Sequence, residues 1–343
     1  MASGAQTQLF TKKAQIFVSE ETADNDTYIT QVAGEAILAE IGDTPYTVDG
    51  DNYSPSSMRG DFLSQDEVPG LASTGFTFRV PCHGSGTAGT APEFADALMA
   101  CGMREELVAA TSVTYFPYGV YDAAVDAVGP PIFRNPWTSY SVTLLEDGVA
   151  YRMKGAYGNV VLVGEVGMPL FLEFTMTGAY QAIGDDALES VSYDTAVSPT
   201  FVGATFEMNF GGAVTPKGIN NFTLDCGNTI AVQNDINDAA GVYGARITDR
   251  KSFGSFDPEM VLSATANSSF YALARAGTTG TLTTGVVGGT AGNKWEVDVN
   301  RCVMRPIEMQ NRENVRALTV PFAVSSAGTD AEGTNLDWSL QFT

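Results

Sequence analysis

The stretch Thr90–Gly102, TAPEFADALMACG, carries a dense set of helix signals. Thr90 and Glu93 have the spacing of a capping box, in which each side chain accepts a hydrogen bond from the other residue's backbone N–H. Pro92 suits a first helical turn, where its missing N–H costs nothing. Gly102 is placed to end the helix in the left-handed conformation. One apolar stripe has helical spacing: Phe94, Ala97, Leu98 and Cys101.

The residues after this helix predict a sheet. Tyr140–Glu146 and Val149–Lys154 are separated by Asp147-Gly148, a strong short-range signal for a β-hairpin. Further strands are expected at 160–163 and 170–177. The segment between helix and hairpin, Met103–Trp137, is interpreted as a long loop whose aromatic residues Tyr115, Phe116, Tyr118 and Tyr121 pack on something. The sequence therefore predicts one helix laid on a sheet.

The rest of the chain continues the β pattern. The acidic segment Asp43–Asp66 is also interpreted as a long loop. A second short helix is expected from an N-cap at Asn267, through Phe270 and Leu273, to a stop at Gly277. Other strands are expected at 14–18, 76–80, 201–210, 219–225, 245–249, 259–265, 280–287, 295–304 and 316–324.

Composition and charge exclude some classes of function. The 343 residues are 44% hydrophobic and only 17% charged, with 36 glycines, which favours a β protein with a real core and many turns. The net charge of −22 excludes a protein that binds nucleic acid by neutralising phosphates. It also disfavours an anionic membrane surface. Met1–Phe10 lacks the apolar core of a signal peptide, and no apolar run approaches the length of a membrane span.

The four cysteines suggest no zinc site, because no Cys-x-x-Cys or Cys-x-x-x-Cys spacing occurs. We expect Cys82, Cys101, Cys226 and Cys302 to be reduced thiols in a protein assembled in a cytoplasm.

The two halves of the chain have the same order of parts. Each has a strand, a short helix ending on Gly102 or Gly277, a hairpin and a long last strand. We interpret this as a tandem duplication, with an N-terminal arm at 1–13, domain 1 at 14–183, a linker at 184–199 and domain 2 at 200–343. The alternative is two unrelated α+β domains that each carry one helix.

No residue pattern indicates catalysis, a cofactor or a metal, so the chain is not expected to be an enzyme. The single histidine, His83, is expected to have a surface or cap role. The glycine-rich run 288–294 is expected to be a hairpin turn into Trp295 and not a phosphate loop. The acidic runs 49–52 and 235–238 lack the calcium-loop pattern. Arg59-Gly60-Asp61 is interpreted as a chance match to an adhesion tripeptide.

Three stretches together resemble the tail tube (major tail) proteins of long-tailed bacteriophages. They are PEFADALMACG at 92–102, YSVTLLEDGVAYRMKG at 140–155, and the closing strand that ends FLEFTMTGAY at 171–180. The second half is similar in its order of parts, with Ile247–Lys251 before its helix. The insertion 103–137 departs from the compact pattern of that family.

The resemblance implies two β-sandwich/barrel domains, each with one flanking helix, whose strands form a closed barrel between subunits. It implies a structural virion protein that stacks as rings into a hollow tube, assembled in the bacterial cytoplasm. Rings of three chains with pseudo-sixfold symmetry are preferred and hexamers remain possible. The implied partners are tail terminator, tape measure and distal tail proteins, with DNA passing an acidic lumen without specific binding. The alternatives are another virion or secretion-tube component (neck, decoration or connector protein) or a calcium-dependent glycan-active enzyme.

Overall fold

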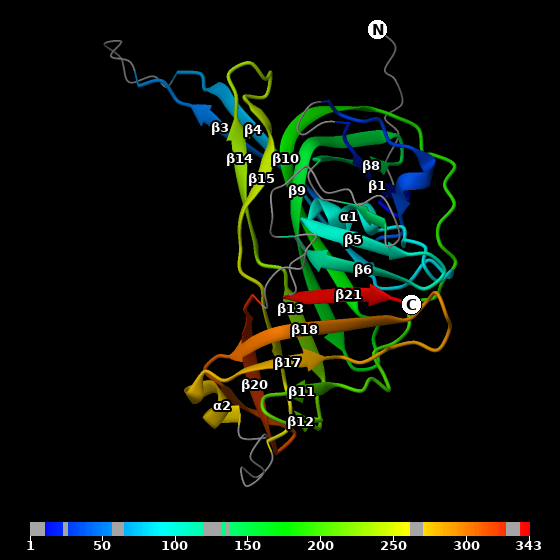
Figure 1. Cartoon of the computed structure of the whole chain (residues 1–343). Coiled ribbons are helices and arrows are strands. Elements are labelled where there is room, and N and C mark those ends of the chain that lie inside the picture. The colour runs from blue at the N-terminus through cyan, green and yellow to red at the C-terminus, as the bar shows by residue number, and fades with distance from the viewer. Residues whose placement is uncertain are drawn as a thin grey trace.

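The computed structural model describes residues 11–22, 27–56, 65–118, 132–134, 138–260, 270–326 and 337–343 (Figure 1). Strands make up 54% of it and helices 6%, which confirms the mainly β prediction. The strands of one large sheet pair antiparallel, and no barrel closes within the described residues of one chain. A separate two-stranded sheet completes the structure.

The first half contains strands β1 (Ala14–Glu20), β2 (Ala36–Ile37), β3 (Tyr46–Tyr53), β4 (Val68–Pro81), β5 (Met103–Val108), β6 (Ser112–Pro117), β7 (Ile132–Arg134), β8 (Tyr140–Glu146), β9 (Val149–Glu165) and β10 (Phe171–Asp185). It also contains helix α1 (Ala95–Ala100) and a 3-10 turn, η1 (Ala33–Glu35).

The second half contains β11 (Glu207–Asn209), β12 (Ala213–Val214), β13 (Asn221–Asp225), β14 (Asn228–Asn234), β15 (Val242–Arg250), β16 (Phe253–Phe256), β17 (Thr279–Thr283), β18 (Trp295–Met304), β19 (Glu308–Arg312), β20 (Val315–Val324) and β21 (Trp338–Phe342), with helix α2 (Phe270–Ala276).

The strand order occurs twice. In the first half the neighbours run β2–β1–β8–β9–β10–β4–β3. In the second they run β12–β11–β17–β18–β20–β16–β13, with β19 continuing the β18 edge along β20. A β-bulge recurs at the same place. Between Val142 and Tyr140 the partner on β9 moves from Met153 to Ala156, and between Leu282 and Gly280 the partner on β18 moves from Val299 to Cys302.

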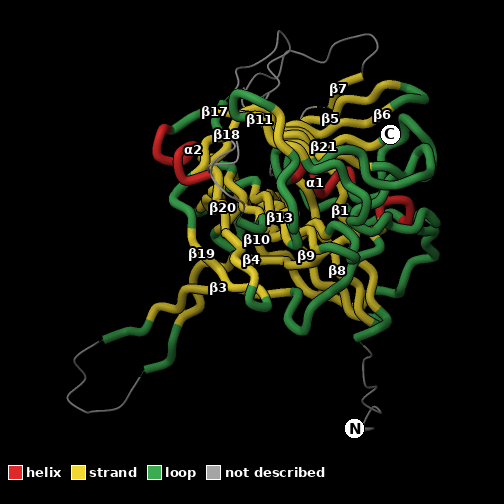
Figure 2. Tube along the Cα trace, turned by 90° about the horizontal axis from the view of Figure 1, so that it is seen from below, coloured by secondary structure: helices red, strands yellow, loops and turns green. Residues whose placement is uncertain are grey.

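The two halves share one sheet and one core. β13 pairs with the end of β9, and β21 pairs with β6. One cluster of buried apolar residues includes Phe76 and Leu98 from the first half and Trp295 and Trp338 from the second. Figure 2 shows these strands packed in one body, viewed end-on. The domain boundaries at 183 and 200 stay a prediction.

Helix α1 lies in this core, but the predicted capping box does not form. The helix starts after Phe94, and no side chain caps its N-terminus. The Glu93 carboxylate instead accepts from the backbone N–H groups of Leu38 (2.6 Å) and Asp194 (3.0 Å), which belong to two loops distant in the chain. Gly102 has φ of 72°, as expected of a glycine that ends a helix.

Both predicted long loops contain regular structure. Within Asp43–Asp66 the chain forms β3, which pairs with the extended start of β4. Within Met103–Trp137 it forms β5 and β6, which pair with each other and carry buried residues such as Met103, Val113 and Tyr115. Tyr118 is also buried, so the aromatic packing was correct, whereas Tyr121 lies outside the described residues.

Other local predictions fared differently. Asp147 and Gly148 have φ of 43° and 107°, the signs of a type I′ hairpin turn, which confirms that hairpin. The predicted strands at 149–154 and 160–163 are one continuous strand, β9. Of the strand expected at 201–210, only residues 207–209 form β11. Asn267 and most of the strand at 259–265 lie outside the described residues.

Candidate self-association surface

Six neighbouring strands present one side of the large sheet to solvent. A register row crosses them from β4 to β20: Arg79, Glu173, Val161, Asp225, Phe253 and Ala323. Every residue of this row is exposed or half-buried, and alternate residues such as Val80, Leu172 and Leu224 are buried on the other side. This surface of β4, β10, β9, β13, β16 and β20 is called the open face below.

The open face combines apolar side chains, among them Val161, Phe253 and Ala323, with several carboxylates. Glu173 and Glu165 project from it as exposed carboxylates. Asp225 is half-buried and accepts from Asn159 Nδ2 (2.8 Å) and the Gly227 N–H (2.7 Å). The Arg79 guanidinium is held by Glu40 at 2.6 Å, at the edge of the face. Such a surface attracts cations and repels polyanions.

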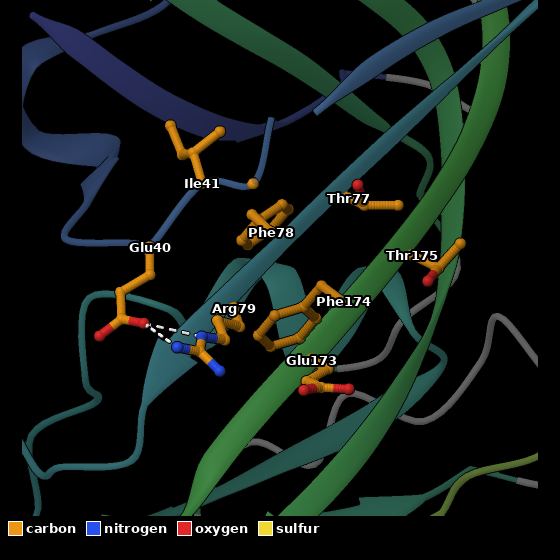
Figure 3. A pocket seen from close by; sticks show the side chains of 9 residues that line it. Glu40, Ile41, Thr77, Phe78, Arg79, Glu173, Phe174 and Thr175 are labelled. Carbon is orange, nitrogen blue, oxygen red and sulfur yellow. Dashed lines mark hydrogen bonds and ion pairs between the residues drawn. The ribbon is translucent and has the colours of Figure 1, made fainter. Parts of the chain in front are cut away.

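Beside Arg79 the edge of β4 is hollowed into a pocket of about 360 Å³ (Figure 3). The segment Glu40–Gly42 forms one wall, and side chains of β4 and β10 form the other. Phe78 and Phe174 stack at 5.1 Å in it, and the Glu40–Arg79 ion pair lies beside them. The pocket therefore marks a place where β4 lacks a full neighbouring strand.

Over the residues that the structure describes, the short strands β2, β7 and β12 of the large sheet each pair with one strand only, and so do two longer strands. The longer two are β3, which within the described ranges pairs only with β4, and β19, which pairs only with β20. Residues 47–53 of β3 and 308–311 of β19 are exposed, and the Met309 side chain is 61% exposed. An unpaired strand edge offers a row of backbone donors and acceptors to another strand.

Two long hairpins lie side by side at one end of the molecule (Figure 1). They are β3–β4 and β14–β15, linked by the Ala72 N–H, which donates to the Ala240 carbonyl at 3.0 Å. Lys154 of β9 pairs with Asp238 at the β14–β15 turn at 2.7 Å. The β3–β4 hairpin exposes apolar side chains at Val48, Tyr53 and Val68, which is unusual for a surface made to face only water.

A buried carboxyl group fixes the end of β1. Glu21 is 2% exposed, and it accepts from the Ser141 hydroxyl and the Gly155 N–H, both at 2.8 Å, and from Ser139. Burial raises the pKa of the Glu21 carboxyl, although these hydrogen bonds and Lys154 act against the rise. The arrangement holds β1, β8 and β9 together.

The four cysteines are buried free thiols, as expected. Burial raises the pKa of each of them, that of Cys302 to about 12. A thiol that stays protonated at neutral pH is a poor nucleophile. The cysteines therefore act as small apolar side chains of the core.

The surface role expected of His83 is wrong. Its ring is 2% exposed, lies 3.0 Å from the Gly84 carbonyl through Nδ1, and meets the Phe94 ring edge-on at 5.6 Å. The run 288–294 is a turn, since Val287 pairs with Trp295, which confirms that prediction. Arg59-Gly60-Asp61 lies outside the described residues.

The acidic runs serve local structure. Asp49 and Asp51 lie on β3, Asp235 accepts from the Asn237 N–H, and Asp238 pairs with Lys154. Within the described ranges no group of three or more His, Cys, Asp or Glu residues is arranged to hold a metal ion.

Sequence reasoning missed the free edges and the arm-like hairpins. The run Tyr46-Thr47-Val48 was the available strand signal, but the acids after it favoured a loop.

None of the described helices is long and apolar enough to span a bilayer. No protein-family model matches the chain, and no curated protein matches it either.

Proposed function

We propose that this chain is a structural subunit that associates with copies of itself into rings, stacked as the hollow tail tube of a long-tailed bacteriophage. In this proposal each chain contributes two tandem tube-type domains, so three chains form a pseudo-sixfold ring. The tube is part of the virion and assembles in the host cytoplasm. Tail terminator, tape measure and distal tail proteins contact it, and the genome passes through it.

The repeated strand order carries this proposal. Seven strands occur in the same order in each half, and the halves are joined edge to edge by β9 and β13. One sheet that already joins two repeats, with a free edge at β3 and another at β19, is suited to continue into further copies. Closing such a sheet into a ring removes both edges, which would otherwise template aggregation.

The charge of the open face is consistent with a bore. DNA carries one negative charge per roughly 1.7 Å of its axis, so basic side chains on the wall would retain it. Glu165, Glu173 and Asp225 on the open face would repel it, while Arg79 is paired with Glu40. A genome would slide along this wall without sticking.

Negative-stain microscopy of the full chain, with mass measurement of the assembled species, tests the proposal. We expect stacked rings or tubes with three chains per ring. Rings that never stack would favour the alternative of a neck, decoration or connector protein. A monomer that persists at high micromolar concentration, with both edges protected from amide exchange, would refute self-association.

A further inference from the structure

We propose that the β19 edge of one copy pairs antiparallel with the β3 edge of the next, with Met309 opposite Tyr46, as β9 pairs with β13 inside one chain. This inference deepens the proposed function and rests on it. The β9–β13 pairing joins the two repeats within one chain. We assign the pairing between chains to the strands that are equivalent to β9 and β13 in the opposite repeats.

The strand correspondence follows from the pairing orders. β9 in the first repeat corresponds to β18–β19 in the second. β9 pairs with β8 on one side and β10 on the other, and β18–β19 pairs in the same way with β17 and β20. β3 and β13 also correspond, because each is the outer neighbour of the strand that leads to a helix, β4 or β16. Within the chain, β9 pairs with β13. The equivalent partner of β19 is therefore β3, which lies on a second copy.

The shared bulge fixes the register. When the two bulges are aligned, Met153 of β9 is equivalent to Val299, and Ala156 is equivalent to Cys302. With the irregular residues between β18 and β19 taken into account, Leu162 is equivalent to Met309. Following the strand pairings through β20 and β16 in one repeat, and through β10 and β4 in the other, makes Leu224 of β13 equivalent to Tyr46 of β3. Leu162 and Leu224 are partners inside the chain, so Met309 and Tyr46 become partners between chains.

Backbone directions agree independently with this register. The Thr77 N–H donates to the Pro45 carbonyl at 2.9 Å, so Pro45 faces β4 and the peptide groups of Tyr46 face the free edge. On the other strand, Glu313 and Asn314 have φ of 49° and 69° and form a two-residue type I′ turn between β19 and β20. The pair that flanks such a turn is hydrogen-bonded, so Arg312 faces β20 and Met309, three residues earlier, faces the free edge.

Two further observations support a covered edge. Met309 is an exposed apolar side chain on a strand edge, whereas its counterpart Leu162 is fully buried. The β14–β15 hairpin, which follows β13, contacts β9 and β10. By the same correspondence the β3–β4 hairpin, with its exposed Val48 and Val68, would lie on β18–β20 of the neighbouring copy.

Cysteine cross-linking tests the register on the assembled full chain. Thr47 and Glu308, one step from Tyr46 and Met309, are both exposed and form the adjacent non-hydrogen-bonded pair. Cα atoms in such pairs lie about 4.5 Å apart, within the range of a disulfide. We expect Thr47→Cys/Glu308→Cys to give covalent trimers on mild oxidation that reduction releases. Each single variant, and Thr47→Cys/Asn311→Cys with its side chains on opposite faces, should stay monomeric on a denaturing gel.

The proline variant Met309→Pro removes a backbone donor from the free edge without touching the β19–β20 ladder. We expect it to fold with a native circular dichroism spectrum and to lose ring formation, while Met309→Ala retains it. Rings that form without the Thr47–Glu308 cross-link, or that survive Met309→Pro, would overturn this joint and leave the proposed function standing. A wild-type chain that forms no rings would overturn both.

Discussion

Replacing Arg250 should loosen the attachment of the β14–β15 hairpin to helix α1. Arg250 lies at the end of β15, and its Nη2 donates to the Gly102 carbonyl at 2.8 Å and the Cys101 carbonyl at 3.2 Å. Its Nη1 donates to the Tyr118 carbonyl at 3.1 Å, and its Nε to Asn228 Oδ1 at 2.7 Å. A positive charge there also suits the carbonyl end of a helix.

The expected loss follows from these contacts. A hydrogen bond from a charged donor contributes about 1.5–3 kcal/mol, but bonds that share one side chain do not add. We therefore expect Arg250→Ala to lower the free energy of unfolding by about 3 kcal/mol. With an unfolding entropy of roughly 2.1 cal/mol/K per residue, the melting temperature of the 343-residue chain should fall by about 4 °C.

The assay is thermal unfolding followed by near-ultraviolet circular dichroism. Arg250→Lys should fall between wild type and Arg250→Ala, since a lysine keeps the charge but loses the forked geometry. Arg275→Ala, at an exposed position on α2, is the control and should melt with the wild type. If Arg250→Ala also melted within about 1 °C of wild type, the contacts at the helix end would not stabilise the fold as reasoned.

Three further changes have expected outcomes. Gly102→Ala should destabilise the fold by about 1–3 kcal/mol, because φ is 72° and the added Cβ would lie 2.4 Å from Arg250 Nη2. Calorimetry of Gly102→Ala, Arg250→Ala and the double variant should show that the two losses of stability are not additive. Glu21 has a raised folded-state pKa, so its contribution to stability grows as the pH falls through that value; melting at pH 7 and pH 5 should therefore show wild type gaining stability relative to Glu21→Gln as the pH is lowered, and equal shifts in both would contradict this. Glu173→Lys, in assembled tubes, should retain DNA at low salt and release it at high salt in a filter-binding assay, whereas wild type and Glu173→Gln should not retain it; retention by Glu173→Gln would show that the added positive charge is not the cause.

The sequence predicted elements whose signals are local. Asp147-Gly148 set a hairpin through backbone conformation alone, and the alternation from Trp295 to Met304 gave the bounds of β18. β3 was missed because it is exposed along most of its length, so it shows no burial period, and its acids favour loops. β5 and β6 form a local hairpin with each other, but its turn contains Ala109 and Ala110, with Ala110 at φ of 56°, so it lacks the Asn-Gly or Asp-Gly signal of such turns.

The capping box failed for a physical reason of the same kind. Glu93 has the right spacing from Thr90, but Leu38 and Asp194 supply backbone donors from far along the chain. The candidate surface was predictable only in outline. The acid excess of the first half, 25 acids against 8 bases, could be counted from the sequence, whereas which acids share a face depends on strand register.

The β9–β13 joint has a consequence for how fast a ring would nucleate. A covalent link holds the two repeats at high effective concentration, so half of the six seams in a pseudo-sixfold ring would form during folding and without any collision. The remaining seams need only three molecules to meet. Nucleation would then depend on a lower power of protein concentration than in a ring of six separate domains. Closed rings would therefore still form at low protein concentration.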